Sequence, residues 1–260
     1  KGGGVLQSQF GLLPYRQGDY LIIPRDIIHR FDMDEGEEIR FLIFESAGYV
    51  RTPRRYRSEH GQHLEHSPFC ERDFRLPDEL PVHDESGEFR VLTKKFNAVH
   101  ELVYKYHPFN VVGWDGYYYP WAFNIEDFEP ITGRVHQPPP VHQTFESEGY
   151  VVCSFVPRLY DYHPEAVPVP YNHSNVMSDE IIFYATEEFM SRKGVEFGSI
   201  TMHPDGTPHG PHPGSVEKAL GKKETNELAV MCDTFRPLNV AKAAVEIEDK
   251  EYVRSWLEAD

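Results

Sequence analysis

The chain has 260 residues, of which 40% are hydrophobic, and its 42 acidic side chains outnumber 26 Lys and Arg to give a net charge of -16. This charge argues against a nucleic-acid backbone or an anionic membrane surface as partner, because both would be repelled. The sequence has no apolar run near the length that a membrane span requires. Three widely spaced cysteines do not make a disulfide framework. We therefore expect a cytoplasmic protein with reduced thiols and one large or two smaller cores.

Short β-type runs separated by turn residues dominate the chain, which contains 21 prolines and 19 glycines. Residues 18–29, GDYLIIPRDIIH, combine a glycine, an apolar run, a proline and a final histidine, His29. Residues 38–44 predict a strand after them. Only 17 residues precede Gly18 and residue 1 is lysine, so we expect the natural protein to extend further toward its N-terminus.

The middle of the chain combines a polar connection with two predicted strands, and the end predicts a helix. Residues 51–81 form a polar connection rich in Arg, Glu and His, which we expect to wrap the surface. Strand character resumes at residues 89–93 and 102–106. Residues 245–258 carry apolar side chains at several positions among charged ones, a spacing that predicts a terminal amphipathic helix.

A candidate metal site lies in the second half. His173 and Asn175 would face the same side of an extended strand, and Glu180 opens the apolar run at residues 181–184. Glycine and proline within residues 198–209, GSITMHPDGTPH, turn the chain so that His209 can return to the same pocket. Two imidazoles and one carboxylate on a rigid β scaffold leave coordination positions open, which is typical of non-haem Fe(II) oxygenases.

Residues 198–209 repeat the pattern of residues 18–29 at an offset of 180 residues, with Asp26 in place of the second glycine. The repeat predicts two related β-barrel lobes. We expect the first lobe to be metal-free, because the residues before Gly18 are too few to hold the carboxylate half of a first motif. The predicted domains are an N-terminal lobe with its surface connection, a C-terminal metal-binding lobe and a helical tail, at residues 1–107, 108–238 and 239–260.

Both halves of the candidate site resemble the two motifs of the cupin superfamily. The second match is close: glycine, five residues, proline, one residue, glycine, two residues, histidine. The first is partial, with Asn175 where a second histidine is usual and Glu187 where the family tends to have glycine. The resemblance implies an all-β, two-lobed cupin fold, a double-stranded β-helix or jelly roll, with a few short helices. Cupins include oxygenases, isomerases and storage proteins, so the match indicates fold more than function.

Residues 108–128, PFNVVGWDGYYYPWAFNIEDF, resemble the central segment of the homogentisate 1,2-dioxygenase family. Residues 170–173, PYNH, and 207–211, TPHGP, match the same family. The resemblance covers the chain from about Phe10 to Pro237, in several separate motifs in the same order. The loop at residues 187–194 is built differently, and the family's usual N-terminal portion is absent.

This resemblance implies an iron enzyme of tyrosine and phenylalanine catabolism that opens homogentisate to maleylacetoacetate with both atoms of O2. Its cofactor would be Fe(II), its partners a small aromatic substrate and O2, and its state a homo-oligomer. His173, Glu180 and His209 fall on the family's iron ligands. His136 falls on its catalytic acid and base, and Tyr171 on a tyrosine that lines the substrate pocket beside His209.

Some choices stay open. Asp179 is adjacent to Glu180, which we prefer as the ligand because it abuts the apolar run and lies seven residues after His173, an allowed cupin spacing. The partner of the substrate's carboxylate could be any of three arginines, at positions 134, 158 and 192. The aromatic residues within 114–121 could line the pocket or pack in a core. Four histidines are expected around the ligands or in solvent: His142, His163, His203 and His212.

Two other function classes remain possible. The same ligands would serve a cupin dioxygenase that acts on another hydroquinone carboxylate, such as gentisate or a hydroxylated homogentisate. A cupin isomerase or binding protein would instead hold zinc or manganese. Metal content separates the classes, and turnover of a panel of substrates separates the dioxygenases.

Overall fold

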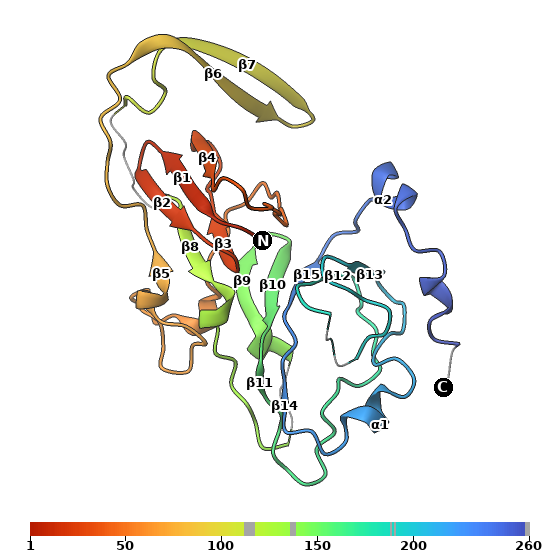
Figure 1. The fold of residues 1–260 in the computed structure, drawn as a ribbon. Coiled ribbons are helices and arrows are strands. Elements are labelled where there is room, and N and C mark those ends of the chain that lie inside the picture. The colour runs from red at the N-terminus through yellow and green to blue at the C-terminus, as the bar shows by residue number, and fades with distance from the viewer. Residues whose placement is uncertain (112–117, 136–138, 188, 190, 258–260) are drawn as a thin grey trace. The chain divides into compact units, whose positions relative to one another are not determined.

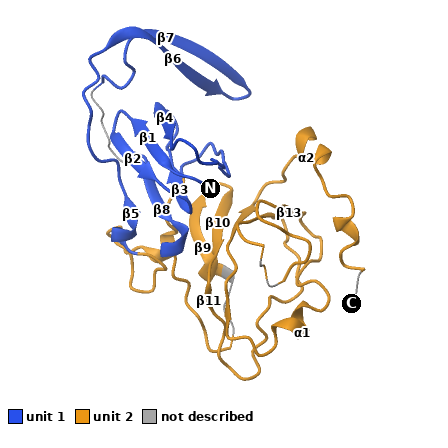
Figure 2. Ribbon diagram, in the orientation of Figure 1, with its two compact units in different colours: residues 1–49, 70–127 blue, residues 50–69, 128–260 orange. Residues whose placement is uncertain are grey.

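The computed structural model describes residues 1–111, 118–135, 139–187, 189 and 191–257. The prediction of a mainly β protein with a few short helices is confirmed (Figure 1). The chain divides into two compact units (Figure 2). Unit 1 comprises Lys1–Tyr49 and Cys70–Asp127, and unit 2 comprises Val50–Phe69 and Phe128–Asp260. The polar connection at residues 51–81 is therefore divided, with its first part in unit 2 and its second in unit 1.

In its described residues, unit 1 contains three small antiparallel sheets with the strand orders β2-β1-β4, β3-β8-β5 and β6-β7. Its elements are β1 (Gly4–Ser8), β2 (Gly11–Tyr15), β3 (Asp19–Ile22), β4 (His29–Met33), η2 (Glu71–Asp73), β5 (Phe74–Arg75), β6 (Ser86–Lys95), β7 (Ala98–Tyr106), β8 (Trp121–Asn124) and η3 (Ile125–Asp127). Alternation along β1 and β2 buries Leu6, Leu13 and Tyr15 in one cluster with Ala122 of β8. The strands predicted at residues 89–93 and 102–106 are confirmed as β6 and β7.

The strand predicted at residues 38–44 is wrong. These residues, all within the described part of the chain, form no strand, and Ile43 is exposed. The apolar pattern serves a different purpose, because Phe41 packs its ring against Tyr15 and Phe31, with centroids 5.8 and 5.2 Å apart. These ring contacts hold the segment together with two backbone hydrogen bonds between Arg40 and Lys1, so no continuous strand ladder forms there.

Unit 2 is built on a five-stranded antiparallel sheet with the order β13-β12-β15-β10-β9 and a two-stranded sheet β11-β14. Its elements are η1 (Arg54–Tyr56), η4 (Pro139–His142), β9 (Gln143–Ser147), β10 (Tyr150–Phe155), β11 (Arg158–Leu159), β12 (Asp179–Tyr184), β13 (Ile200–His203), α1 (Ser215–Ala219), β14 (Glu224–Thr225), β15 (Ala229–Thr234), α2 (Lys242–Glu246) and η5 (Tyr252–Arg254). The strand predicted at residues 181–184 is confirmed within β12.

The core of unit 2 lies on one face of the large sheet. Ile182 and Tyr184 of β12 are buried there with Cys153 of β10 and with Ala229 and Met231 of β15. The register places Ile182 beside Met231 and Tyr184 beside Ala229. Because side chains alternate along a strand, the residue two before Ile182 must face the same side. That residue is Glu180.

The amphipathic helix predicted at residues 245–258 is wrong as a continuous element. In the described residues the segment contains only the end of α2 and the single turn η5. Two of its side chains, Tyr252 and Trp256, place their rings 5.8 and 5.0 Å from that of His212, whereas Ile247 and Val253 are exposed. Across the described ranges, no helix has both the length and the apolar content to cross a membrane.

The predicted internal repeat has a counterpart in the backbone. Gly18 and Gly198 adopt left-handed φ angles of 86° and 89°, and Asp26 adopts 73°, the same value as Gly206. Aspartate is one of the few residues with a side chain that tolerate this region, so the substitution keeps the turn. The two segments therefore share a conformation although one glycine is replaced.

Hydrogen bonds repeat as well. In each copy the histidine Nδ1 lies beside the carbonyl oxygen two residues earlier, at 2.9 Å from Ile27 for His29 and at 2.8 Å from Thr207 for His209. The two histidines differ in exposure, since His29 is exposed and His209 is buried.

Candidate metal site

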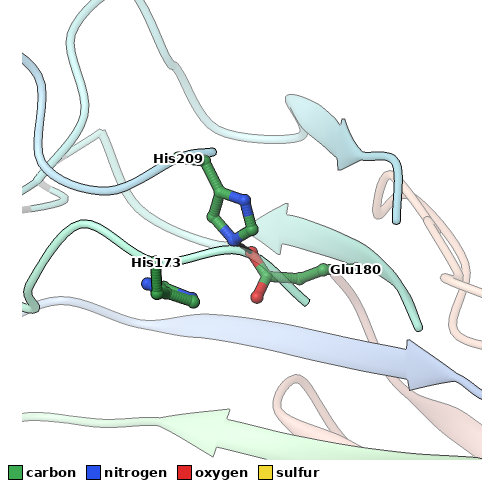
Figure 3. Close-up of side chains that lie close together, drawn as sticks. All are labelled: His173, Glu180 and His209. Atoms are coloured by element: carbon green, nitrogen blue, oxygen red, sulfur yellow. Dashed lines mark ion pairs between the residues drawn. The ribbon is translucent and has the colours of Figure 1, made fainter. Parts of the chain in front are cut away.

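The candidate site lies where the core-facing row of the large sheet ends in polar residues. On β12 this row runs Tyr184, Ile182, Glu180, and Glu180 pairs across the sheet with His203 of β13 and Asp233 of β15. All three side chains therefore belong to the face that carries the core. Figure 3 shows His173, Glu180 and His209 converging, and ligand atoms of these three residues lie within 4.8 Å of one another.

His173 and His209 are fixed to each other through their backbones. Each N–H donates to the other residue's carbonyl at 2.8 Å, which makes an isolated β-bridge in place of the extended strand predicted for His173 and Asn175. A Cβ on Gly210 would lie 2.8 Å from the Cα of Asn172, so the residue after His209 must be glycine for the two segments to approach.

The tautomers of the two histidines suit metal binding. Nδ1 of His173 is 2.9 Å from the carbonyl oxygen of Tyr171, and Nδ1 of His209 is 2.8 Å from that of Thr207. A carbonyl can only accept, so each Nδ1 carries the proton and each Nε2 presents a lone pair. Nε2 of His209 is buried, has no hydrogen-bond partner and lies 3.7 Å from Oε1 of Glu180.

Asp179 and Glu180 have different partners because they face opposite sides of β12. The carboxylate of Asp179 accepts from the backbone N–H of Asp205 at 2.9 Å and of Leu238 at 2.7 Å, so it organises two loops. Glu180 turns toward the histidines, with Oε1 2.6 Å from Nδ1 of His203. Burial would raise the pKa of Glu180, but the hydrogen bond from His203 outweighs it, the neighbouring imidazole of His209 adds to this effect, and the pKa stays well below its ordinary value.

His203 and Asp233 are site residues that sequence reasoning underrated or missed. His203 stacks on His209 with ring centroids 4.4 Å apart, and burial lowers its pKa below the ordinary value. Burial raises the pKa of Asp233 to about 7, and the charge of Glu180 adds to this effect. Alternation from the buried Met231 could have indicated Asp233, and the step of two from the buried Thr201 could have indicated His203.

The three candidate arginines are separated by their surroundings. Arg134 is exposed. Arg158 is buried with Glu227, and their charged atoms Nη1 and Oε1 are 2.7 Å apart. Arg192 lies beside the site, since it donates to the carbonyl of Gly210 and its Nη2 is 3.4 Å from Nε2 of His203.

The remaining predicted residues have varied positions. Tyr171 is 59% exposed at the edge of the site, with its ring 5.8 Å from that of His173. His136 lies outside the described residues, as do Trp114 and Tyr117. Within unit 1, Tyr118 contacts Tyr49 and Trp121 contacts Phe74.

Besides His203, three other histidines were expected around the ligands or in solvent, and all three lie within the described residues. His142 is buried against Phe155, and burial lowers its pKa to about 3, so the imidazole is neutral. His212 is buried and holds the tail through Ser255 Oγ, which lies 3.1 Å from its Nε2. His163 is half-buried.

Two imidazole nitrogens and one carboxylate at these distances could hold a metal ion. The buried, unpartnered Nε2 of His209 is an observation that favours a bound cation, because a buried polar atom without a partner is otherwise costly. The donor set of two nitrogens and one oxygen suits a divalent transition metal with open positions. Asn175 supports the carboxylate, with Nδ2 3.4 Å from Oε2 of Glu180.

Family models match nearly the whole chain. Residues 1–125 match the model described as homogentisate 1,2-dioxygenase N-terminal, and residues 139–259 match the one described as homogentisate 1,2-dioxygenase C-terminal.

Individual relatives of this chain are described as dioxygenases, at identities from 43% to 25%. A predicted dioxygenase of Saccharolobus solfataricus is 43% identical over 254 residues, which cover 97% of this chain and 65% of that protein. The homogentisate 1,2-dioxygenase of Mus musculus is 26% identical over 277 residues, which cover 98% of this chain and 60% of the mouse protein. That of Nitrobacter hamburgensis is 25% identical over 272 residues, covering 98% and 59%. The chain thus spans 59 to 65% of the length of these curated relatives.

Proposed function

The chain belongs to the homogentisate 1,2-dioxygenase family, and we propose that it is an Fe(II)-dependent dioxygenase that opens homogentisate to maleylacetoacetate with both atoms of O2. The observation that carries this proposal is the convergence of His173, Glu180 and His209, two imidazoles and one carboxylate, at the end of a core-facing strand row. The internal repeat supports a two-lobed cupin scaffold for this site, with the metal held in the second lobe.

Each residue of the proposed site has a defined task. Nε2 of His173, Nε2 of His209 and a carboxylate oxygen of Glu180 would hold Fe(II), while the hydrogen bonds at Nδ1 keep the imidazoles oriented. Fe(II) bound there would allow electrons to pass from the phenolic ring to O2, because the ring and O2 do not react with each other directly. Tyr171, at the exposed edge of the site, would contact the ring, and His136 would move protons to and from the ring hydroxyl.

Arg192 is the arginine that the surroundings favour for the substrate's carboxylate. Arg158 is neutralised by Glu227 within a buried ion pair, and Arg134 is exposed. Arg192 carries its charge next to His203, which contacts Glu180.

We expect the protein, purified anaerobically with Fe(II), to hold about one iron per chain and to consume O2 with homogentisate. The test measures metals by elemental analysis and O2 uptake with a panel of hydroquinone carboxylates that includes gentisate. Turnover of gentisate alone would move the proposal to another substrate of the same reaction. Full occupancy by zinc, with no O2 uptake after reconstitution with Fe(II), would contradict the dioxygenase itself and favour an isomerase or a binding protein.

His136→Ala should retain iron and fold yet lose turnover by about a hundredfold or more, the usual effect of removing a general acid or base. An imidazole titrates near neutral pH and can both take and return a proton there. Thermal midpoint, iron content and O2 uptake are measured on one preparation. An unchanged rate per iron with a lowered midpoint would instead make His136 a turn residue before three prolines.

A further inference from the structure

One buried side chain, His212, holds the backbone on both sides of Arg192. The N–H of His212 donates to the carbonyl of Ser191 at 2.9 Å, and its Nδ1 accepts from the N–H of Lys193 at 2.8 Å. His212 is only 1% exposed. Two hydrogen bonds that bracket one residue restrain its backbone, so the direction of the Arg192 side chain depends on the position of His212.

The other ring nitrogen of His212 faces residues 252–256. An amide N–H can only donate, so Nδ1 of His212 carries the lone pair and Nε2 carries the proton, which it donates to Oγ of Ser255 at 3.1 Å. The rings of Tyr252 and Trp256 contact the imidazole edge to face, with centroids 5.8 and 5.0 Å away. Burial is the main reason that the pKa of His212 falls to about 4, so the imidazole is neutral at pH 7 and keeps this tautomer.

Arg192 connects the same loop to the candidate metal site. Its Nη1 donates to the carbonyl of Gly210, and its Nη2 lies 3.4 Å from Nε2 of His203. Tyr252 lies near the same guanidinium: burial raises the pKa of its hydroxyl, and the positive charge of Arg192 acts in the opposite direction. Contacts therefore continue from residues 252–256 to the edge of the site.

We propose that His212 is a positioning residue that transmits the docking of residues 252–256 to Arg192, and that this docking determines the affinity for the substrate's carboxylate. The inference rests on the proposed function, in which Arg192 binds that carboxylate. Arginine has many rotamers, and a restrained backbone lowers the entropy cost of directing its guanidinium at an anion. Release of His212 should therefore weaken substrate binding more than it slows the chemical step.

Trp256→Ala tests the link, because Trp256 is 40% exposed and lies outside the core cluster of unit 2. The KM for homogentisate should rise about tenfold while kcat stays within about twofold, as for a loss of binding shared by substrate and transition state. Iron content should not change. Trp256→Phe keeps a ring on His212 and should restore the wild-type KM. The matched control is Val253→Ala, in the same turn and 72% exposed, which should leave the KM unchanged.

Two further comparisons identify the group and the route. Methylhydroquinone has no carboxylate, so the wild type and Trp256→Ala should turn it over at equal rates. His212→Asn loses its contacts with residues 252–256 but keeps an oxygen near the position of Nδ1 for the N–H of Lys193. The double variant His212→Asn/Trp256→Ala should raise the KM no more than either single substitution, because both break the same link.

Hydrogen exchange tests the link without turnover. In protein prepared without metal, the N–H of Lys193 should exchange about tenfold faster in Trp256→Ala than in the wild type by NMR, while the N–H groups of β12 keep their rates. Faster exchange in a protein that takes up no O2 with homogentisate would contradict the proposed function and still support positioning by His212. Unchanged exchange at Lys193, an equal rise in KM for Val253→Ala, or multiplied effects in the double variant would each overturn the inference.

Discussion

Glu180→Gln is expected to lose its metal, while Asp179→Asn keeps it. The two residues are adjacent but face opposite sides of β12, and only Glu180 lies on the face that carries His203 and the core. A neutral amide is a much weaker ligand than a carboxylate for a divalent cation, so metal content should fall from about one per chain to a small fraction. Elemental analysis after gel filtration measures this directly.

Asp179→Asn should show a different defect in the same experiment. Its carboxylate accepts two backbone N–H groups, from Asp205 and Leu238, and an asparagine oxygen oriented toward one leaves its amide facing the other. An unsatisfied buried donor costs about 1–3 kcal/mol, so the thermal midpoint should fall while the metal stays. Loss of metal in Asp179→Asn together with its retention in Glu180→Gln would place the ligand at position 179.

Arg158→Met should lower the free energy of unfolding by about 3–5 kcal/mol, the usual cost of removing one partner from a buried ion pair. The side chains of Arg158 and Glu227 are only 7% and 1% exposed, so the remaining carboxylate would be buried without its counter-charge. Denaturant unfolding at a fixed metal concentration measures the change.

The double variant Arg158→Met/Glu227→Leu is the control for this pair. It removes both charges at once and should recover most of the lost stability, because a buried ion pair contributes little net stability over an apolar pair of similar size. If Arg158→Met kept full stability but raised the KM for the substrate, Arg158 would be acting on the substrate's carboxylate after all.

Periodicity predicted the parts of the fold that depend on one face of a strand. It indicated Glu180 and the apolar run after it, because the step of two that buries Ile182 and Tyr184 also orients the carboxylate. It could not separate residues 38–44 from a strand, since the pattern is the same whether a strand ladder holds the segment or the ring contacts of Phe41 and two hydrogen bonds to Lys1 do.

Other features depend on contacts between distant parts of the sequence. His203 and Asp233 reach Glu180 only through the pairing of β12 with β13 and β15, which no local pattern specifies. The tail was predicted as a helix because its apolar spacing suits one, but His212 provides a docking point that a short turn satisfies. The roles of His136 and Tyr171 come from resemblance, and both stay predictions.

The turn that carries His209 resembles the turn around His29: residues at equivalent positions are left-handed, and each imidazole Nδ1 hydrogen-bonds the carbonyl two residues earlier. Because His29 is exposed, its turn does not owe its shape to a buried ion. The local sequence therefore determines the conformation of the turn around His209 before a metal binds. Metal binding should then cost little conformational entropy in this turn. We therefore expect the turn around His209 to keep its conformation when the metal is removed.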